Sequence, residues 1–238
     1  NIGYSLSGGK NYDGTTDISA AGALTASLGD LSNGFGLFEN VEEFDIDFLL
    51  MGSGSYATAT AQALANKLIS VAELRKDAVA FISPNKSTFI SGAGTDSATV
   101  ASAADITNNV LEFYAPITSS TYAVLDSGYK YMFDRFGNTF RYIPLNGDIA
   151  GTCARNDINN FPWFSPAGTA RGAVLNAVKL GYNPNQSQRD RLYTNRINPV
   201  IFSPGAGIVL FGDKTGFGKA SAFDRINVRR LFIFIEEA

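Results

Sequence analysis

Three aspartates are the side chains in this sequence best suited to acid and base chemistry. Asp45 and Asp47 stand two apart where apolar and acidic residues alternate over residues 44–50. This is the period of a strand, so both carboxylates are predicted on one strand face. The two could be paired carboxylates for acid and base work, and a carboxylate-dependent hydrolase could use Asp45, Asp47 or Asp134. The alternative is that they are surface charges on a solvated face.

Arginines near the end of the chain offer a different chemistry. Arg225, Arg229 and Arg230 lie beside or within an apolar run that ends in two glutamates, at 236–237. A guanidinium binds carboxylates through a planar fork of donors, so these residues could form buried or interfacial ion pairs. The alternative is solvation, with a link to the two glutamates along a helix. Asp224 is placed to cap that helix.

Two glycine-containing segments resemble phosphate-binding loops, but each lacks part of the required pattern. Residues 52–57 read Gly-Ser-Gly-Ser-Tyr-Ala between a predicted strand and a predicted helix, the context of a dinucleotide-binding turn. The acidic residue that would hold a ribose is missing after the next strand, 78–82. The alternative to nucleotide binding is a tight turn with Ser55 as the helix cap. A phosphate loop at 207–215 is interrupted by Asp213.

Cysteine and histidine counts exclude several kinds of site. The chain has no histidine, which rules out a Ser-His-Asp triad, a Cys-His pair and the usual zinc sites. Cys153 is the only cysteine, so no intrachain disulfide forms, and we expect it to pack inertly on a buried helical face. No run of about eighteen apolar residues is present to span a membrane. We predict no cofactor and no metal.

Charge is distributed unevenly along the 238 residues. The formal net charge is -3, which does not favour nucleic acid as a partner. Up to Tyr129 there are 14 acidic and 5 basic side chains, and from Lys130 onward there are 8 acidic and 14 basic ones. The split is either a solvated surface or a device by which the acidic part of one copy faces the basic part of the next.

The elements that must position these residues alternate between strands and helices. After the strand at 44–50 comes a helix with an apolar stripe from Ala57 to Ala72, then a buried strand at 78–82 and a helix at 96–114. This order predicts an α/β (α+β) fold, a mixed sheet flanked by helices. Residues 1–40 are rich in glycine and serine, so we expect turns and short edge strands there.

The second half of the chain contains shorter elements. A strand at 122–125 precedes a hairpin that pairs 129–133 with 139–143. Asp148 could cap a short helix, and Pro184 could begin another that runs to about Arg196. Strands are expected at 200–202 and 208–211, and a helix rather than a strand at the end, with Val228, Leu231, Phe232 and Ile235 on its buried face.

Two domains follow from these patterns. Residues 1–40 are predicted to form the glycine-rich edge segment, and residues 41–238 the α/β core. Within the core, 41–135 would contain the strand-helix units and 136–238 the C-terminal portion. We expect both parts to share one hydrophobic core, because neither alone has enough apolar stripes to cover a sheet.

An ordered set of segments in the last hundred residues resembles a known family. The segments are 141–151 (RYIPLNGDIAG), 162–168 (PWFSPAG) followed by Arg171 and Gly172, 208–215 (IVLFGDKT) and 223–237 (FDRINVRRLFIFIEE). No single piece is diagnostic, but the order resembles the tail sheath protein of contractile-tailed bacteriophages. A glycine-rich turn at 6–9 also resembles that family.

The resemblance implies a structural protein and not an enzyme. Copies would stack as hexameric rings around an inner tail tube protein and contract, driving the tube through the host envelope for genome delivery. The other expected partners are baseplate and tail terminator proteins. Neither direct nucleic-acid binding nor membrane insertion is expected, and the subunit would belong to the virion after assembly in the host cytoplasm. The competing hypothesis is the hydrolase above, as a virion enzyme.

The residues expected to matter are therefore structural or interfacial. They are Trp163, Arg171, Asp224, Arg225, Arg229 and Arg230. In the resembled family, ring contacts are made largely by chain ends that add strands to a neighbour's sheet. Because the chain opens on Asn1 and stops after an apolar run, we expect a fragment that stays monomeric by itself.

Overall fold

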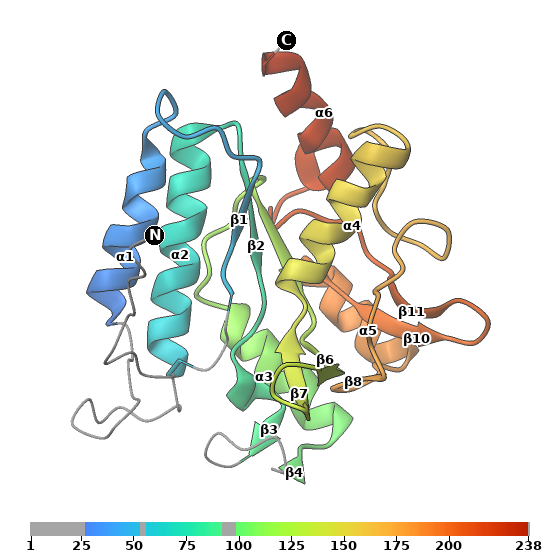
Figure 1. Cartoon of the computed structure of the whole chain (residues 1–238). Helices are drawn as coiled ribbons and strands as arrows, with labels where there is room; N and C mark the ends of the chain where they lie inside the picture. Colours follow the sequence, from blue (N-terminus) through green and yellow to red (C-terminus); the bar gives the residue numbers. More distant parts are fainter. Residues whose placement is uncertain (1–26, 53–55, 92–98, 238) are drawn as a thin grey trace, which may run out of the picture.

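A parallel sheet lies at the centre of the structure, a computed structural model that describes residues 27–52, 56–91 and 99–237 (Figure 1). Neighbouring strands run in the order β1, β2, β5 and β9, and all three pairings are parallel. The strands are β1 (Phe48–Leu50), β2 (Val79–Ile82), β5 (Ala123–Asp126) and β9 (Ile197–Asn198). Together with the antiparallel sheets described below, they confirm the predicted α/β class with mixed strand pairing.

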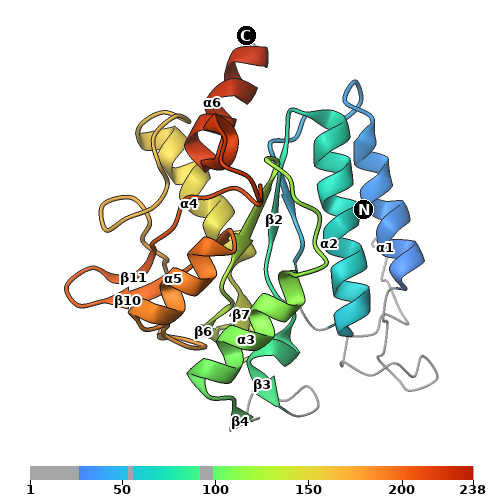
Figure 2. The same cartoon turned by 180° about the vertical axis from the view of Figure 1, so that it is seen from behind.

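Both faces of the central sheet are covered. Every residue of β2 and of β5 is buried, as expected for parallel strands with helices on both sides. Because side chains alternate along a strand, Ala80 and Ile82 join one apolar cluster while Val79 and Phe81 join the other. Figures 1 and 2 show α1 and α2 on one flank of the sheet and α4 and α6 on the opposite flank.

The first cluster is built on α2 (Thr58–Arg75), α3 (Ala103–Tyr114) and one side of the sheet. The predicted stripe of α2 is confirmed from Ala61 onward, since Ala61, Leu64, Ala65, Leu68 and Ala72 are all buried, whereas Ala57 is exposed. The predicted capping is not: Ala57 occupies the N-cap position without a side-chain bond, and Ser55 lies outside the described residues. The helix therefore takes its stability from its buried stripe.

Residues 28–36 correct the prediction of turns and edge strands for the first forty residues. They form α1 (Leu28–Gly36), followed by a 3-10 turn, Leu37–Glu39. Ser27 and Asp30 form a capping box that satisfies backbone donors at the helix start. Leu28, Leu31 and Phe35 pack on the first cluster, and this burial outweighs the poor helix propensity of the glycines. Residues 1–26, including the glycine-rich turn at 6–9, lie outside the described part.

The helix predicted at 96–114 begins later, at Ala103, where Ser102 accepts a hydrogen bond from the backbone N–H of Asp105. Thr99–Val100 form β4, which pairs with β3 (Ile90–Ser91), and the residues between these strands lie mostly outside the described part. The predicted apolar face is confirmed, because Ile106, Val110 and Phe113 are all buried.

The second cluster joins the other side of the sheet to α4 (Asn146–Asn159), α6 (Ile226–Glu237) and an antiparallel pair, β10 (Val200–Ser203) with β11 (Gly207–Leu210). Cys153 packs in this cluster, and burial raises the pKa of its thiol to about 12, as expected for an inert residue. Asp148 does not cap α4. The N-cap position is Leu145, and Asp148 instead pairs with Lys130, 2.7 Å away.

The predicted hairpin is confirmed as β6 (Tyr129–Asp134) with β7 (Thr139–Pro144), and β8 (Lys179–Leu180) completes a three-stranded antiparallel sheet. The next helix, α5 (Gln186–Thr194), begins two residues later than predicted. Its cap is Asn185, in a capping box with Gln188, and Pro184 lies before the cap. The remaining 3-10 turns are η2 (Lys86–Thr88) and η3 (Ala222–Asp224).

A candidate structural site at the start of the closing helix

The predicted closing helix is confirmed as α6, but it turns a different face inward. Ile226, Arg229, Arg230 and Ile233 are buried, the i, i+3, i+4 and i+7 pattern of one helical stripe. Of the predicted face, Phe232 and Ile235 are 38% and 57% exposed. Two arginines therefore occupy positions that periodicity alone assigns to apolar side chains.

Arg230 is buried because its charge is matched. Both guanidinium Nη atoms donate to the carboxylate of Asp157 on α4, at 2.9 Å and 2.5 Å. The guanidinium also lies 5.1 Å from the ring centroid of Phe48 in β1. Burial alone would lower the pKa of Arg230, but the hydrogen bonds and negative charge of Asp157 raise it instead. One side chain thus joins α6, α4 and the central sheet.

Arg229 is buried without a carboxylate partner among the described residues. It donates to the hydroxyl groups of Tyr122 (3.2 Å) and Thr121 (2.8 Å). Its guanidinium lies between the rings of Tyr122 and Phe223, 4.2 Å and 4.3 Å from their centroids. Aromatic faces attract a cation electrostatically, and they replace here the ion pair that the sequence suggested.

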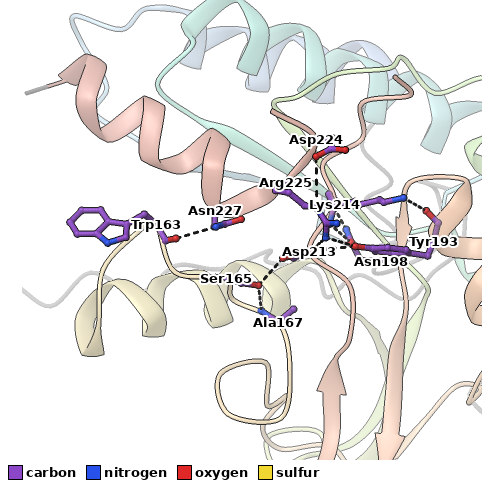
Figure 3. Close-up of polar contacts among 10 residues, drawn as sticks. All are labelled: Trp163, Ser165, Ala167, Tyr193, Asn198, Asp213, Lys214, Asp224, Arg225 and Asn227. Carbon is purple, nitrogen blue, oxygen red and sulfur yellow. Dashed lines mark hydrogen bonds and ion pairs between the residues drawn. The ribbon is translucent and has the colours of Figure 1, made fainter. Parts of the chain in front are cut away.

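Asp213 is the hub that ties the start of α6 to the rest of the domain (Figure 3). One carboxylate oxygen accepts from Arg225, which also donates to the Tyr193 hydroxyl at 2.6 Å. The other oxygen accepts from Ser165 at 2.9 Å, and the Asp213 carbonyl accepts from the backbone N–H of Ile226 at 2.8 Å. The hydrogen bond to Asp213 raises the pKa of Arg225 further.

Sequence reasoning missed this role of Asp213. It noticed the residue only as an interruption in a possible phosphate loop. Nothing in the local pattern could have found it, because its three side-chain partners come from segments 12 to 48 residues away along the chain. Only the tertiary structure shows that these partners meet at Asp213.

Asn198 holds the segment that carries Asp213. Its fully buried side chain donates to the carbonyls of Leu125 and Lys214, at 3.0 Å and 2.7 Å, and accepts from the Lys214 N–H at 2.7 Å (Figure 3). Gly212 leaves the room for this contact, because a Cβ there would lie 2.9 Å from Asn198 Oδ1. The close approach requires glycine at this position.

Asp224 does not cap the closing helix. It belongs to the 3-10 turn η3, whose cap is Ser221, and its carboxylate lies 3.8 Å from Arg225 Nε. Its carbonyl accepts from the Thr215 N–H at 2.9 Å. The predicted cap is therefore wrong, because the chain stays extended at Arg225 and α6 starts only at Ile226.

Trp163 and Arg171 belong to a long segment between α4 and β8 that reaches the same region. The Trp163 carbonyl accepts from Asn227 at 3.1 Å (Figure 3). The Trp163 ring stacks on Phe161, with centroids 4.6 Å apart. Arg171 donates to the Ser165 carbonyl at 2.7 Å and lies over the ring of Phe164. Trp163 remains 36% exposed, so it stands at the surface and not in the core.

A buried carboxylate is a second polar feature that the sequence did not single out. Asp126, at the carboxyl end of β5, accepts from the Ser83 hydroxyl and from the Gly128 N–H. Ser83 in turn accepts from the Asn146 N–H at 2.8 Å, which fixes the start of α4. Burial raises the pKa of Asp126 to about 8. The group bridges β2, β5 and α4.

The aspartates considered for hydrolysis do not come together. Asp45 and Asp47 precede β1 and are not part of it, at the amino edge of the parallel sheet. Asp134 ends β6, in the hairpin that follows the carboxyl edge, and pairs with Arg141. The strand predicted at 44–50 is shortened to Phe48–Leu50, so the strand face expected to carry Asp45 and Asp47 is wrong. In the described part of the chain no group of three or more acidic, cysteine or histidine side chains could hold a metal ion.

The proposed nucleotide turn is only partly described. Gly52 adopts a left-handed φ of 72°, and its carbonyl accepts from Asn146 at 3.0 Å, while residues 53–55 lie outside the described part. Gly52 is thus used to anchor α4. Within the described ranges, no helix has both the length and the apolar character needed to cross a bilayer.

Fold and site together define an α/β domain whose charged residues bind its own elements to one another. The chain belongs to the phage tail sheath family: the model of the phage tail sheath protein central domain matches residues 14–216. This match confirms the resemblance found in the sequence.

Two curated relatives agree with the family assignment. The tail sheath protein of Enterobacteria phage T4 is 38% identical over 231 residues, which cover 94% of this chain and 34% of that protein. The tail sheath protein of Vibrio phage KVP40 is 37% identical over 238 residues, covering 98% of this chain and 35% of that protein. The chain thus spans about a third of the length of these relatives.

Solved structures share the fold at lower identity. A chain of the anti-feeding prophage baseplate matches with a TM-score of 0.59 and 17% identity, over 90% of this chain and 49% of that one. The helical sheath of the same system, in its contracted state, matches with a TM-score of 0.57 and 19% identity, over 90% and 51%. These likenesses show the common fold.

Proposed function

We propose that this chain is the central structural part of a contractile tail sheath subunit. The observation that carries the proposal is the family match over residues 14–216, together with the 38% identity to the T4 tail sheath protein. Copies would polymerise around an inner tail tube and contract to drive it through the host envelope. The expected partners are further copies in stacked rings, the tube protein, and baseplate and terminator proteins.

The internal ion pairs support a structural role. A subunit that moves as a rigid body during contraction must transmit force without unfolding, and interfaces change while packed cores stay intact. Arg225, Arg229 and Arg230 each connect α6 to a different segment. We infer that these residues, with Trp163 and Arg171, keep the closing helix in place on the domain.

No bond needs to be made or broken in this role. The energy for contraction would be stored in the packing of subunits assembled in a higher-energy state and released at the baseplate. We propose on this basis that the protein is not an enzyme, and that it resides in the phage tail after assembly in the host cytoplasm. The hydrolase hypothesis has less support, because Asp45 and Asp47 lie outside β1 and Asp134 pairs with Arg141.

Residues 41–238 are proposed to fold as one domain. Both apolar clusters combine early and late residues: Leu49 and Ile197 belong to the first, Val79 and Ile233 to the second. Limited proteolysis should leave a single resistant core. Release of two independently folded pieces, split near residue 135, would contradict the proposal.

Electron microscopy of the full-length protein that contains this chain tests the function. Regular tubes or stacked rings, formed by the purified protein or around a tail tube, are the expected result. A full-length protein that remains dispersed, both by itself and with its tail tube, would contradict the proposal.

A further inference from the structure

The tip of the β6–β7 hairpin carries exposed aromatic and basic side chains. Phe136 at the turn is 88% exposed, and Phe133 and Phe140 behind it are 44% and 42% exposed. Arg135 lies over the Phe136 ring, 4.9 Å from its centroid, and makes no ion pair within the described residues. Aromatic residues and arginine are the types that anchor protein interfaces.

This hairpin tip is also rigid. The Asp134 carboxylate accepts from the backbone N–H groups of Phe136 and Gly137, at 3.0 Å and 3.1 Å, and pairs with Arg141 at 3.1 Å. These hydrogen bonds hold the pKa of Asp134 below its usual value. A Cβ on Gly137 would lie 2.7 Å from Asp134 Oδ2, so a side chain there would displace the carboxylate from these hydrogen bonds. A preorganised tip loses little entropy when it binds.

A pocket of about 190 Å³ lies at the other end of the domain, under α6. A volume of about 150 Å³ is large enough for benzene, so one aromatic ring fits this pocket by size. Its lining combines apolar side chains from the sheet edge, α6 and Pro162 with three carboxylates and one guanidinium. The lining residues are Asp47, Phe48, Asp77, Val79, Asp157, Pro162, Arg230, Ile233 and Phe234.

Charge at the pocket is complementary to charge at the tip. Asp157 forms an ion pair with Arg230, and Asp77 forms one with the buried guanidinium of Arg75, 2.7 Å away. Asp47 is exposed, and its carboxylate makes no ion pair in the part of the chain that the structure describes. Three carboxylates at the pocket thus face two guanidinium groups, Arg75 and Arg230, which leaves one net negative charge, and the tip offers one positive charge without an ion pair beside an exposed ring.

Tip and pocket cannot meet within one molecule. The pocket lies where β1 and β2 begin, at the amino edge of the parallel sheet, whereas β6 follows the carboxyl end of β5. Figure 1 shows the same separation, with α6 at the top and the hairpin in the lower half. A contact between two different patches at opposite ends joins copies head to tail, which produces rings or open helical polymers.

We propose that the β6–β7 tip of one copy docks into the α6 pocket of the next, with Phe136 entering the pocket and Arg135 facing Asp47. The inference rests on the proposed function, because a sheath subunit must contact further copies, and it adds which surfaces meet. A single ring and one exposed ion pair make a weak contact. It would set register and polarity, while other contacts supply most of the affinity.

Cysteine cross-linking tests the contact directly. Cys153 is buried and inert, so an introduced cysteine is the reactive thiol of this chain. Thr139→Cys marks the tip and Asp45→Cys marks the rim of the pocket, and both substitutions leave Phe136, Arg135 and Asp47 in place. The variants are made in the full-length protein that contains this chain, where other contacts bring the copies together. A short bismaleimide added to a mixture of the two variants should give several times more cross-linked dimer than either variant by itself. Thr139→Cys mixed with Lys219→Cys is the control for random collision.

Charge reversal makes the test specific. Arg135→Asp in the tip-marked copy should reduce the cross-linked dimer to the control level, and Asp47→Arg in the pocket-marked copy should restore it. Equal yields in all mixtures, or a dominant tip-to-tip product, would overturn the inference. If electron microscopy of the full-length protein still showed tubes, the proposed function would stand while this assignment of surfaces fell.

Discussion

Arg230 of α6 and Asp157 of α4 are joined by two parallel hydrogen bonds, and the Arg230 side chain is only 9% exposed. The pair lies between two helices on one flank of the sheet and against Phe48 of β1. A buried guanidinium stabilises a fold only while its partner is present, because the charge has lost its hydration. The position of α6 therefore depends on a residue 73 positions away in the sequence.

Asp157→Ala should destabilise the domain strongly, by roughly 3 kcal/mol, since it leaves the Arg230 charge buried and unpaired. We place the effect at the low end of the range for buried pairs because the Asp157 side chain is 28% exposed. Urea unfolding measures it. Asp45→Ala is the control and should change the free energy of unfolding by less than about 0.5 kcal/mol. Equal, small effects of both changes would contradict the structural role of the pair.

Arg229 should respond differently from Arg230, because its cation faces rings and hydroxyl groups. Arg229→Met keeps the stem packed between Tyr122 and Phe223 and leaves no carboxylate unpaired in the described part of the chain. We expect it to cost less than about 1.5 kcal/mol, and Arg229→Ala to cost about 2 kcal/mol or more through lost packing. Thermal unfolding of both variants decides this. A larger loss for methionine than for alanine would be inconsistent with the contacts.

Asp126 should make the folded protein less stable as the pH rises, whereas a carboxylate in a salt bridge makes it more stable. Its pKa is about 8 in the folded protein and about 3.9 in the unfolded chain. The folded state therefore holds a proton that the unfolded state releases between these values. The contribution of Asp126 to the free energy of unfolding has its full value below about pH 4 and decreases as the pH rises toward 8.

Asp126→Asn removes this titration, so the difference in unfolding free energy between wild type and variant should shrink from pH 5 to pH 8. The slope cannot exceed about 1.4 kcal/mol per pH unit for one proton. Denaturant titrations at several pH values measure it. A difference that is constant, or that grows with pH, would mean that Asp126 is ionised in the folded protein.

Gly172 should not tolerate a side chain. A Cβ there would lie 2.7 Å from the Leu210 carbonyl oxygen and 2.9 Å from that of Gly168, and backbone atoms cannot yield easily. Gly172→Ala is expected to destabilise by about 1–3 kcal/mol through overpacking. Gly151→Ala is the matched control, since it lies within α4 with nothing within 4 Å of a Cβ. It should be neutral or stabilise by up to about 1 kcal/mol.

The 238-residue chain alone should sediment as a single species near 25.4 kDa at moderate salt. Its relatives are about three times longer, and the tip-to-pocket contact is too small to offset the entropy of association at micromolar concentration. Exposed ion pairs add only about 0–1 kcal/mol each and weaken with salt. Tubes formed by the chain alone would show that these residues contain the main assembly interface.

Local pattern determined much of the fold. The period of two over 44–50 predicted a strand of which the structure retains β1, and the apolar run at 78–82 predicted β2. The stripe over 57–72 predicted α2, and the strands around the turn at 135–138 predicted the hairpin of β6 and β7. In each case the apolar residues whose burial stabilises the element lie close together in the sequence, so their spacing predicts it. The order of four segments in the last hundred residues was also enough to find the family.

Tertiary structure decided what periodicity could not. Residues 28–36 form a helix because α2 covers their apolar side chains. Arg230 and Arg229 of α6 point inward because Arg230 pairs with Asp157 and Arg229 packs on the ring of Tyr122. Asp213 became the hub of the site through partners brought from distant segments. The sequence by itself determined which stretches are strands or helices and which family they belong to. Only the packed structure determined which charges are paired, because the free energy of a buried charge depends on its neighbours in space.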